Sequence, residues 1–221
     1  MIGIAMTNTD PWMTVPGARG PIMGTNPVAY GIPTGTDRPI FLDIATSSVA
    51  VTKILALKAI GKQLPEKWLV DEHGRPTSDP REYPEKGALL PMAGHKGYGI
   101  AILVETLSAV VTGAAMLSAV NCWLNDIPKP ANEGHAFLAI NVGALMSLGT
   151  FHERLAAMVA EIRRAPKAEG SDRIYVPGEM EHERREKALR EGLTLPDYVL
   201  VNLVGLGQDV GDVAELESLF R

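Results

Sequence analysis

A short glycine-rich stretch that carries two basic side chains is the first feature that could do chemistry. Residues 91–102 read PMAGHKGYGIAI, so three glycines surround His95 and Lys96 at the start of a long apolar run. One interpretation is a tight turn whose glycines let a helix pack closely. The other is an anion site, in which backbone N–H groups and one lysine face a phosphate or a carboxylate. The residues alone leave both interpretations open.

A second candidate residue lies at a predicted strand end. Residues 39–45 (PIFLDIA) predict a buried strand that is interrupted by Asp43, and the hydroxyl-bearing residues 46–48 follow it. Because Ser and Thr are good helix caps, we expect one of these hydroxyls to cap a helix over residues 49–60. Taken by itself, Asp43 is most simply a turn or cap residue.

Other patterns that could do chemistry are weaker. Residues 198–211 (YVLVNLVGLGQDVG) imitate a dinucleotide-binding turn, but the glycine spacing is G-x-G-x-x-x-G and too few residues follow Gly211 for a βαβ unit. The sequence has no nucleophile elbow and no zinc-binding histidine pattern. The pairs His152-Glu153 and His182-Glu183 fit solvated helix faces, and Cys122 shows no sign of activation.

Apolar periodicity predicts the elements that must position these residues. We expect strands over residues 2–7, 28–31, 135–142 and 174–176, in addition to the strand at 39–45. We expect further helices over residues 97–117, 151–164 and, in pieces, 181–220. Residues 62–90 are rich in turn formers and predict a polar connection.

The composition excludes several classes of protein. The chain has 221 residues, of which 46% are hydrophobic and 21% charged, as is typical of a globular protein of one large or two small domains. Its formal net charge of −5 argues against nucleic-acid binding, which needs a basic face. Cys122 is the single cysteine, so a reducing compartment, the cytoplasm, is expected.

Two further features concern membranes and the beginning of the chain. Residues 97–120 are apolar enough for a span, but Glu105 near their middle would be costly in lipid, so a helix buried in a protein core is expected. Residues 1–10 have neither a basic region nor a long apolar core, which predicts no signal peptide. The chain opens directly on a predicted core strand, which indicates either a truncated gene product or the later part of a longer protein.

Several sequence blocks, taken in order, resemble a known family. They are MTNTDP (6–11), GTNPVAYGIP (24–33), FLDIATSSVA (41–50), LPEKWLVDEHGRPTSDP (64–80), LLPMAGHKGYGIAILVETLS (89–108) and VPGEMEHERR (176–185). In these blocks the chain is similar to the malate/L-lactate dehydrogenase family, which is distinct from the Rossmann lactate and malate dehydrogenases. That family also includes ureidoglycolate dehydrogenase, diketogulonate reductase and sulfolactate dehydrogenase.

The resemblance implies a fold, a cofactor and partners. It predicts an α/β protein with a mixed-sheet, non-Rossmann NAD(P)-binding domain over residues 1–178 and a helical C-terminal tail over residues 179–221. The cofactor would be NAD or NADP, and the substrate a 2-hydroxy acid or 2-oxo acid related to malate, lactate or ureidoglycolate. Two subunits of a homodimer would complete each other's sites, with no metal, nucleic acid or membrane involved.

The resemblance also implies which residues touch the cofactor. Carried over by position, they are Thr9 beside the nicotinamide, Asp43, Ile44 and Ala45 at the strand end, Lys96 with His95 at a variable position next to it, and Gly178, Glu179 and Met180 in a late turn. Lys96 would then offer a positive charge to the pyrophosphate or to a ribose phosphate. This favours the anion-site interpretation of residues 91–102.

The catalytic histidine of the family has no counterpart in this chain. The resemblance places it in a short His-Phe-Gly or His-Ser-Gly motif ahead of residue 2, in a region that also supplies an arginine for the substrate carboxylate. Hydride reduction of a ketone needs a proton donor beside the carbonyl, so these 221 residues are expected to bind the cofactor and turn over little substrate. The alternative is a non-catalytic nucleotide-binding or assembly fragment.

Overall fold

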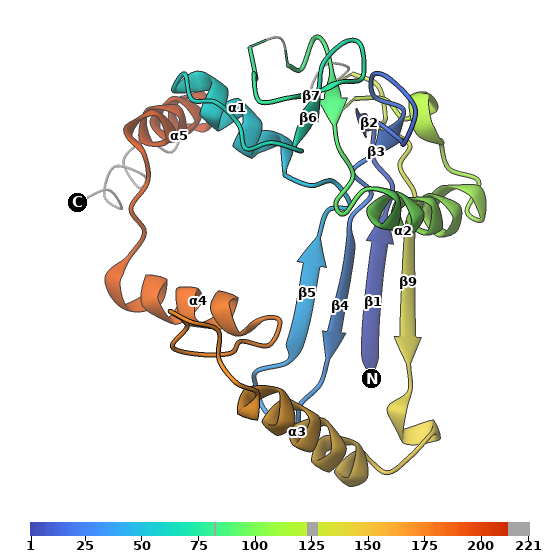
Figure 1. Ribbon diagram of the computed structural model, residues 1–221, viewed down its shortest axis with the longest axis vertical. Helices are drawn as coiled ribbons and strands as arrows, with labels where there is room; N and C mark the ends of the chain where they lie inside the picture. Colours follow the sequence, from blue (N-terminus) through green and yellow to red (C-terminus); the bar gives the residue numbers. More distant parts are fainter. Residues whose placement is uncertain (82, 123–127, 212–221) are drawn as a thin grey trace. The chain divides into compact units, whose positions relative to one another are not determined.

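The fold is mixed α/β and divides into two compact units. The computed structural model describes residues 1–81, 83–122 and 128–211, which form two β-sheets and five α-helices (Figure 1). The first unit, Met1–Gly178, contains both sheets, and the second, Glu179–Arg221, contains the last two helices.

The longer strands form a four-stranded antiparallel sheet in the order β5-β4-β1-β9 (Figure 1). β1 (Ile2–Thr7) lies in the interior of the sheet, between β4 (Val28–Ile32) and β9 (His135–Ile140). β5 (Ile40–Ile44) pairs with β4 and forms one edge. These four strands confirm the expected ones, because each is an apolar run long enough to show its pattern locally.

A second sheet is built from very short strands. Its order is β3-β2-β8-β6-β7, and the β2–β8 pair is parallel. The strands are β2 (Pro11–Met13), β3 (Met23–Gly24), β6 (Leu69–Val70), β7 (Pro76–Thr77) and β8 (Ala88–Leu89). The polar connection expected over residues 62–90 therefore contains three short strands that the sequence did not predict. Strands of two residues are too short to show alternation in the sequence, and pairing across the sheet defines them.

The first helix lacks the expected cap. α1 (Val51–Ala59) begins after Ala50, and no side chain caps it. The hydroxyls of residues 46–48 donate instead to backbone carbonyl oxygens, those of Thr25, Val49 and Leu90 respectively. Two of these three bonds join segments far apart in the sequence, so the hydroxyls fasten the strand end rather than the helix.

The second helix is shorter and less buried than expected. α2 (His95–Glu105) continues into a π-helical turn, Thr106–Val110, and a separate 3₁₀ turn covers Leu117–Ala119. Ala101 is fully buried, whereas Leu103 is 54% exposed and Val111 71% exposed. The helix expected over residues 97–117 thus forms over its first part, but it is not a buried helix throughout, because only one face of α2 meets the core.

The remaining elements are mostly helical. A 3₁₀ turn (Val142–Ala144) follows β9, and α3 (Leu148–Arg164), with Ser147 as its N-cap, confirms the expected helix there. α4 (Glu179–Glu191) and α5 (Asp197–Val210) make up the described part of the second unit. Residues 198–210 are thus helical, in agreement with rejecting a dinucleotide-binding turn. The strand expected over residues 174–176 does not form, and the helical prediction beyond residue 211 lies outside the described residues.

The hydrophobic core of the first unit lies beside the second sheet. In this core, buried side chains from four strands of the second sheet pack against one face of α1 and one face of α2. Its buried members are Met13, Met23, Val49, Ile54, Leu64, Leu69, Tyr83, Leu89 and Ala101. α2 also contacts β1, and the π-helical turn that follows α2 contacts both β1 and β9, so these two elements pack against the larger sheet.

Candidate functional site

A chain of hydrogen bonds joins three segments that lie far apart in the sequence. The backbone N–H of Thr25 donates to Thr9 Oγ1 at 3.0 Å. The carbonyl oxygen of Thr25 accepts from the N–H of Thr46 at 2.8 Å and from its hydroxyl at 2.9 Å. The carbonyl oxygen of Thr46 accepts from the N–H of Met92 at 2.9 Å. The end of β1, the end of β5 and the turn before α2 are therefore fastened to one another.

This arrangement brings together three of the predicted site segments. Thr9 is itself a member of the hydrogen-bonded chain. Asp43, Ile44 and Ala45 directly precede Thr46, while His95 and Lys96 follow Met92 within four residues. The convergence arises from tertiary contacts, since the three segments are separated by more than thirty residues each in the sequence.

The start of α2 presents a basic side chain without an internal partner. A Cβ on Gly97 would lie 2.3 Å from the carbonyl oxygen of Met92, so only glycine lets this turn close. The tight-turn interpretation is thereby confirmed. His95 and Lys96 are both exposed at the first turn of the helix, and Lys96 Nζ has no hydrogen-bond or ion-pair partner among the described residues. A helix N-terminus beside such a cation suits an anion, and the anion-site interpretation stays a prediction.

Asp43 lines a small cavity on one face of the larger sheet. It is exposed on β5 and lies opposite Ala29 of β4, in a row that continues through Ala5 of β1 to Phe137 of β9. The cavity has a volume of about 180 Å³ and is lined by Ala5, Met6, Thr7, Pro27, Ala29, Asp43, His135 and Phe137. Because strand side chains alternate, Ile44 lies on the opposite face of the sheet from Asp43.

Gly178 lies against the same edge strand. The N–H of Phe41 donates to the carbonyl oxygen of Pro177 at 3.3 Å, and a Cβ on Gly178 would lie 2.6 Å from the Phe41 ring. Gly178 also has a φ of 94°, which a side chain would disfavour. Phe41 is two residues from Asp43 on β5, so Gly178 adjoins the Asp43 segment. Glu179 and Met180 are the first residues of α4, in the second unit.

A buried carboxylate network beside Thr9 is the feature that sequence reasoning missed. Glu105 Oε2 accepts from Asn26 Nδ2 at 2.7 Å, and Oε1 accepts from the N–H of Leu117 at 3.0 Å and from Asn8 Nδ2 at 3.5 Å. The Asn26 side-chain oxygen accepts from the N–H of Thr9 at 3.2 Å. The available signal was a single carboxylate inside an apolar run, which by itself argues only against a membrane span.

Titratable groups also gather near the start of β9. Burial raises the pKa of Glu133, the carboxylate of Asp10 raises it further, and the imidazole of His135 lowers it. No cluster of three or more His, Cys, Asp and Glu side chains that could hold a metal ion occurs within residues 1–81, 83–122 and 128–211. No helix among these residues is long and apolar enough to cross a membrane.

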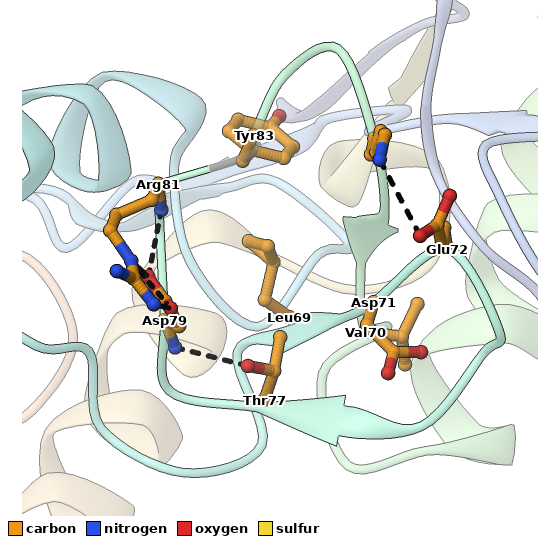
Figure 2. Close-up of a pocket in the computed structure, with 9 residues that line it drawn as sticks. Leu69, Val70, Asp71, Glu72, Thr77, Asp79, Arg81 and Tyr83 are labelled. Atoms are coloured by element: carbon orange, nitrogen blue, oxygen red, sulfur yellow. Dashed lines mark hydrogen bonds and ion pairs between the residues drawn. The ribbon is translucent and has the colours of Figure 1, made fainter.

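A larger cavity lies at the second sheet, away from the predicted site residues. It has a volume of about 530 Å³ and is lined by Leu69, Val70, Asp71, Glu72, Thr77, Asp79, Arg81, Tyr83 and Lys86 (Figure 2). Its charges pair with one another: Arg81 Nε lies 2.8 Å from Asp79 Oδ2, and Lys86 Nζ lies 3.5 Å from Glu72 Oε1. Hydrogen bonds from Arg81 hold the pKa of Asp79 below its usual value. The cavity's charges are therefore largely satisfied internally.

Comparison with known proteins identifies the family. The family described as malate/L-lactate dehydrogenase matches residues 1–204. The malate dehydrogenase of Pyrococcus horikoshii is 34% identical over 218 residues, which are 96% of this chain and 59% of that protein. The ureidoglycolate dehydrogenase (NAD(+)) of Escherichia coli K12 is 32% identical over 203 residues, which are 92% of this chain and 57% of that protein.

A solved structure agrees with these matches. The sulfolactate dehydrogenase of Methanocaldococcus jannaschii superposes with a TM-score of 0.83 at 34% identity, covering 96% of this chain and 60% of that one. The chain therefore belongs to the malate/L-lactate dehydrogenase family, whose matched relatives are oxidoreductases. It spans about three fifths of the length of those relatives.

Proposed function

We propose that this chain binds NAD or NADP and serves in the interconversion of a 2-hydroxy acid and its 2-oxo acid. One observation carries the proposal: the hydrogen-bonded chain from Thr9 through Thr25 and Thr46 to Met92 assembles three segments that the family resemblance assigns to the cofactor. The family's matched relatives act on malate, ureidoglycolate and sulfolactate by name, which makes a small acid of this kind the proposed substrate.

The residues present fit a nicotinamide dinucleotide. Lys96 and Asp43 are both exposed and lack hydrogen-bond or ion-pair partners among the described residues, so each is free to meet a ligand. Lys96 would hold a phosphate at the N-terminus of α2, and Asp43 would accept hydrogen bonds from ribose hydroxyls. Thr9 would lie beside the nicotinamide, and Gly178 would supply a further contact. The family resemblance also assigns Glu179 and Met180 to the cofactor.

The bound nicotinamide supplies the hydride chemistry, and the chain's residues bind and orient it. We propose that residues 1–178 are the cofactor-binding domain and residues 179–221 a helical tail. The antiparallel order β5-β4-β1-β9 supports a non-Rossmann mode of binding, because a Rossmann domain binds at the carboxyl ends of parallel strands. No histidine of this chain is assigned as the acid–base group, since the resemblance places that residue ahead of residue 2.

A titration tests the proposal. The full 221-residue chain is titrated with NADH and with NADPH, following nucleotide fluorescence, and ADP-ribose then competes for the same site. We expect saturable binding of at least one reduced nucleotide and its displacement by ADP-ribose. Absence of binding of NADH, NADPH and ADP-ribose by folded protein would refute the proposal.

The second candidate function is a non-catalytic assembly fragment, and exposed apolar side chains favour it. On α2 and β9, Leu103 is 54% and Phe137 78% exposed. Apolar surface of this kind marks association, so we propose a homodimer. Because one cysteine, Cys122, cannot form a disulfide within these 221 residues, we propose a reducing compartment, the cytoplasm. Sedimentation at micromolar protein concentration tests for the homodimer, and a clean monomer would contradict it. Turnover of NAD(P)H with pyruvate, oxaloacetate or ureidoglycolate would distinguish the enzyme from the fragment.

A further inference from the structure

The geometry points to Glu105 as a positioning residue that holds Thr9 in place for the nicotinamide end of the cofactor. This inference rests on the proposed function and adds a residue that touches no ligand itself. Glu105 is the last residue of α2 and is 5% exposed, and Asn8 and Asn26, which both bond to it, are 0% exposed.

The Glu105 carboxylate is held entirely by N–H donors. Asn26 Nδ2 donates to one oxygen at 2.7 Å, while the N–H of Leu117 at 3.0 Å and Asn8 Nδ2 at 3.5 Å face the other. No lysine or arginine pairs with it among the described residues. A buried carboxylate is costly unless such donors surround it, so the three donors and the carboxylate constrain one another.

The Glu105 carboxylate and the carbonyl oxygen of Ala101, 3.2 Å from Asn26 Nδ2, together fix which way Asn26 faces. Because the carboxylate only accepts, the Asn26 amide must turn its NH₂ toward Glu105 and its oxygen toward the N–H of Thr9, 3.2 Å away. Asn26 holds this orientation at a φ of 30°, a conformation that persists only when its surroundings determine it. The path from Glu105 to Thr9 thus contains one side chain and two hydrogen bonds.

A purely structural carboxylate would need only part of this arrangement. The bond to Leu117 closes the chain after α2, and Asn8 ties β1 to the N–H of Gly134 at 2.8 Å. Neither bond accounts for the connection that runs from Glu105 Oε2 through the Asn26 side chain to the N–H of Thr9. α2 carries Lys96 at its start and Glu105 at its end, about 14 Å apart at a rise of 1.5 Å per residue. One rigid helix therefore sets the spacing between the phosphate contact and the residue at the nicotinamide.

The test compares two ligands that differ at one end. NADH carries the nicotinamide, whereas ADP-ribose ends at the ribose where the nicotinamide would be attached. Glu105→Gln keeps the shape of the side chain but turns an NH₂ toward donors, which breaks the network. We expect the Kd for NADH to rise about tenfold and the Kd for ADP-ribose to change less than twofold.

A matched control separates positioning from lost stability. Ile54→Val removes one methyl group from the core at α1, where Ile54 is 0% exposed, and lowers the unfolding midpoint without touching the network. We expect its ratio of NADH to ADP-ribose affinity to equal that of the wild type. An equal loss for both ligands in Glu105→Gln, or no loss for either, would overturn the inference and leave the proposed function standing.

Hydrogen exchange on the unmutated chain gives a second test that needs no folded variant. The N–H groups of Leu117 and Gly134 donate to Glu105 and Asn8, so their exchange reports on the network. We expect NADH to slow exchange at both positions and ADP-ribose to leave them unchanged. Equal protection by the two ligands overturns the inference, and failure of the wild type to bind either ligand overturns the proposed function with it.

Discussion

Removing the Lys96 side chain is the most direct test of the proposed anion site. Lys96 stands exposed in the first turn of α2, and its ammonium group has no partner among the described residues. Lys96→Ala therefore deletes a charge without breaking an ion pair or opening a core cavity. The fold should remain, and the change should appear in nucleotide binding.

The magnitude follows from the exposure of the lysine. A pair of unit charges 4 Å apart interacts by about 1 kcal/mol in water and about 4 kcal/mol at an effective dielectric constant of 20. Because Lys96 is exposed, the lower end of that range applies. A loss of about 1.4 kcal/mol corresponds to a tenfold rise in Kd for NADH. The loss should shrink as salt is raised, since screening acts strongly on exposed charges.

The assay is a fluorescence titration with NADH at two salt concentrations. Lys62→Ala is the matched control, because Lys62 is also exposed and its removal changes the net charge equally. We expect Lys62→Ala to bind like the wild type and Lys96→Arg to retain most of the affinity. Unchanged affinity in folded Lys96→Ala protein would remove this lysine from the site. An equal loss in Lys62→Ala would show that overall charge, rather than the turn at α2, attracts the nucleotide.

Three further predictions follow from other residues. Asp43→Asn should raise the Kd for NADH about tenfold and the Kd for NADPH by less, because a carboxylate accepts hydrogen bonds from ribose hydroxyls and repels a 2′-phosphate. Titrations of the wild type and the variant with both nucleotides measure this, and an unchanged ratio of the two Kd values counts against the role of Asp43. Tyr83→Phe should raise the free energy of unfolding, measured by urea denaturation, by about 1 kcal/mol, because the Tyr83 hydroxyl is buried without a hydrogen-bond partner among the described residues. A variant less stable than the wild type would contradict this. The 221-residue chain should show 2-oxoacid reductase activity at least about 10²-fold below that of a version extended to include the family's catalytic histidine, as a missing general acid costs about 10² to 10⁴; equal rates would mean that a residue of this chain transfers the proton.

The glycine turn before α2 shows which structural features a short stretch of sequence could predict. The residue types around His95 and Lys96 predicted both a close turn and a basic side chain at a helix start, and the structure confirms the turn and the helix. The larger sheet was similarly predictable, because each of its strands carries its own apolar pattern. Ordered blocks of sequence also identified the family, with Asp43 and Gly178 among the residues they assign to the cofactor.

The sequence by itself thus determined the elements whose pattern is local, together with the family. The tertiary structure decided which side chains meet. Residues 46–48 looked like helix caps, yet their hydroxyls bond to other carbonyls, because Thr25 and Leu90 come close only after folding. Glu105 and Asn26 are 79 residues apart in sequence and 2.7 Å apart in the fold. A buried carboxylate acquires its donors from whatever segments pack around it, so its role depends on long-range contacts that no short window of sequence contains.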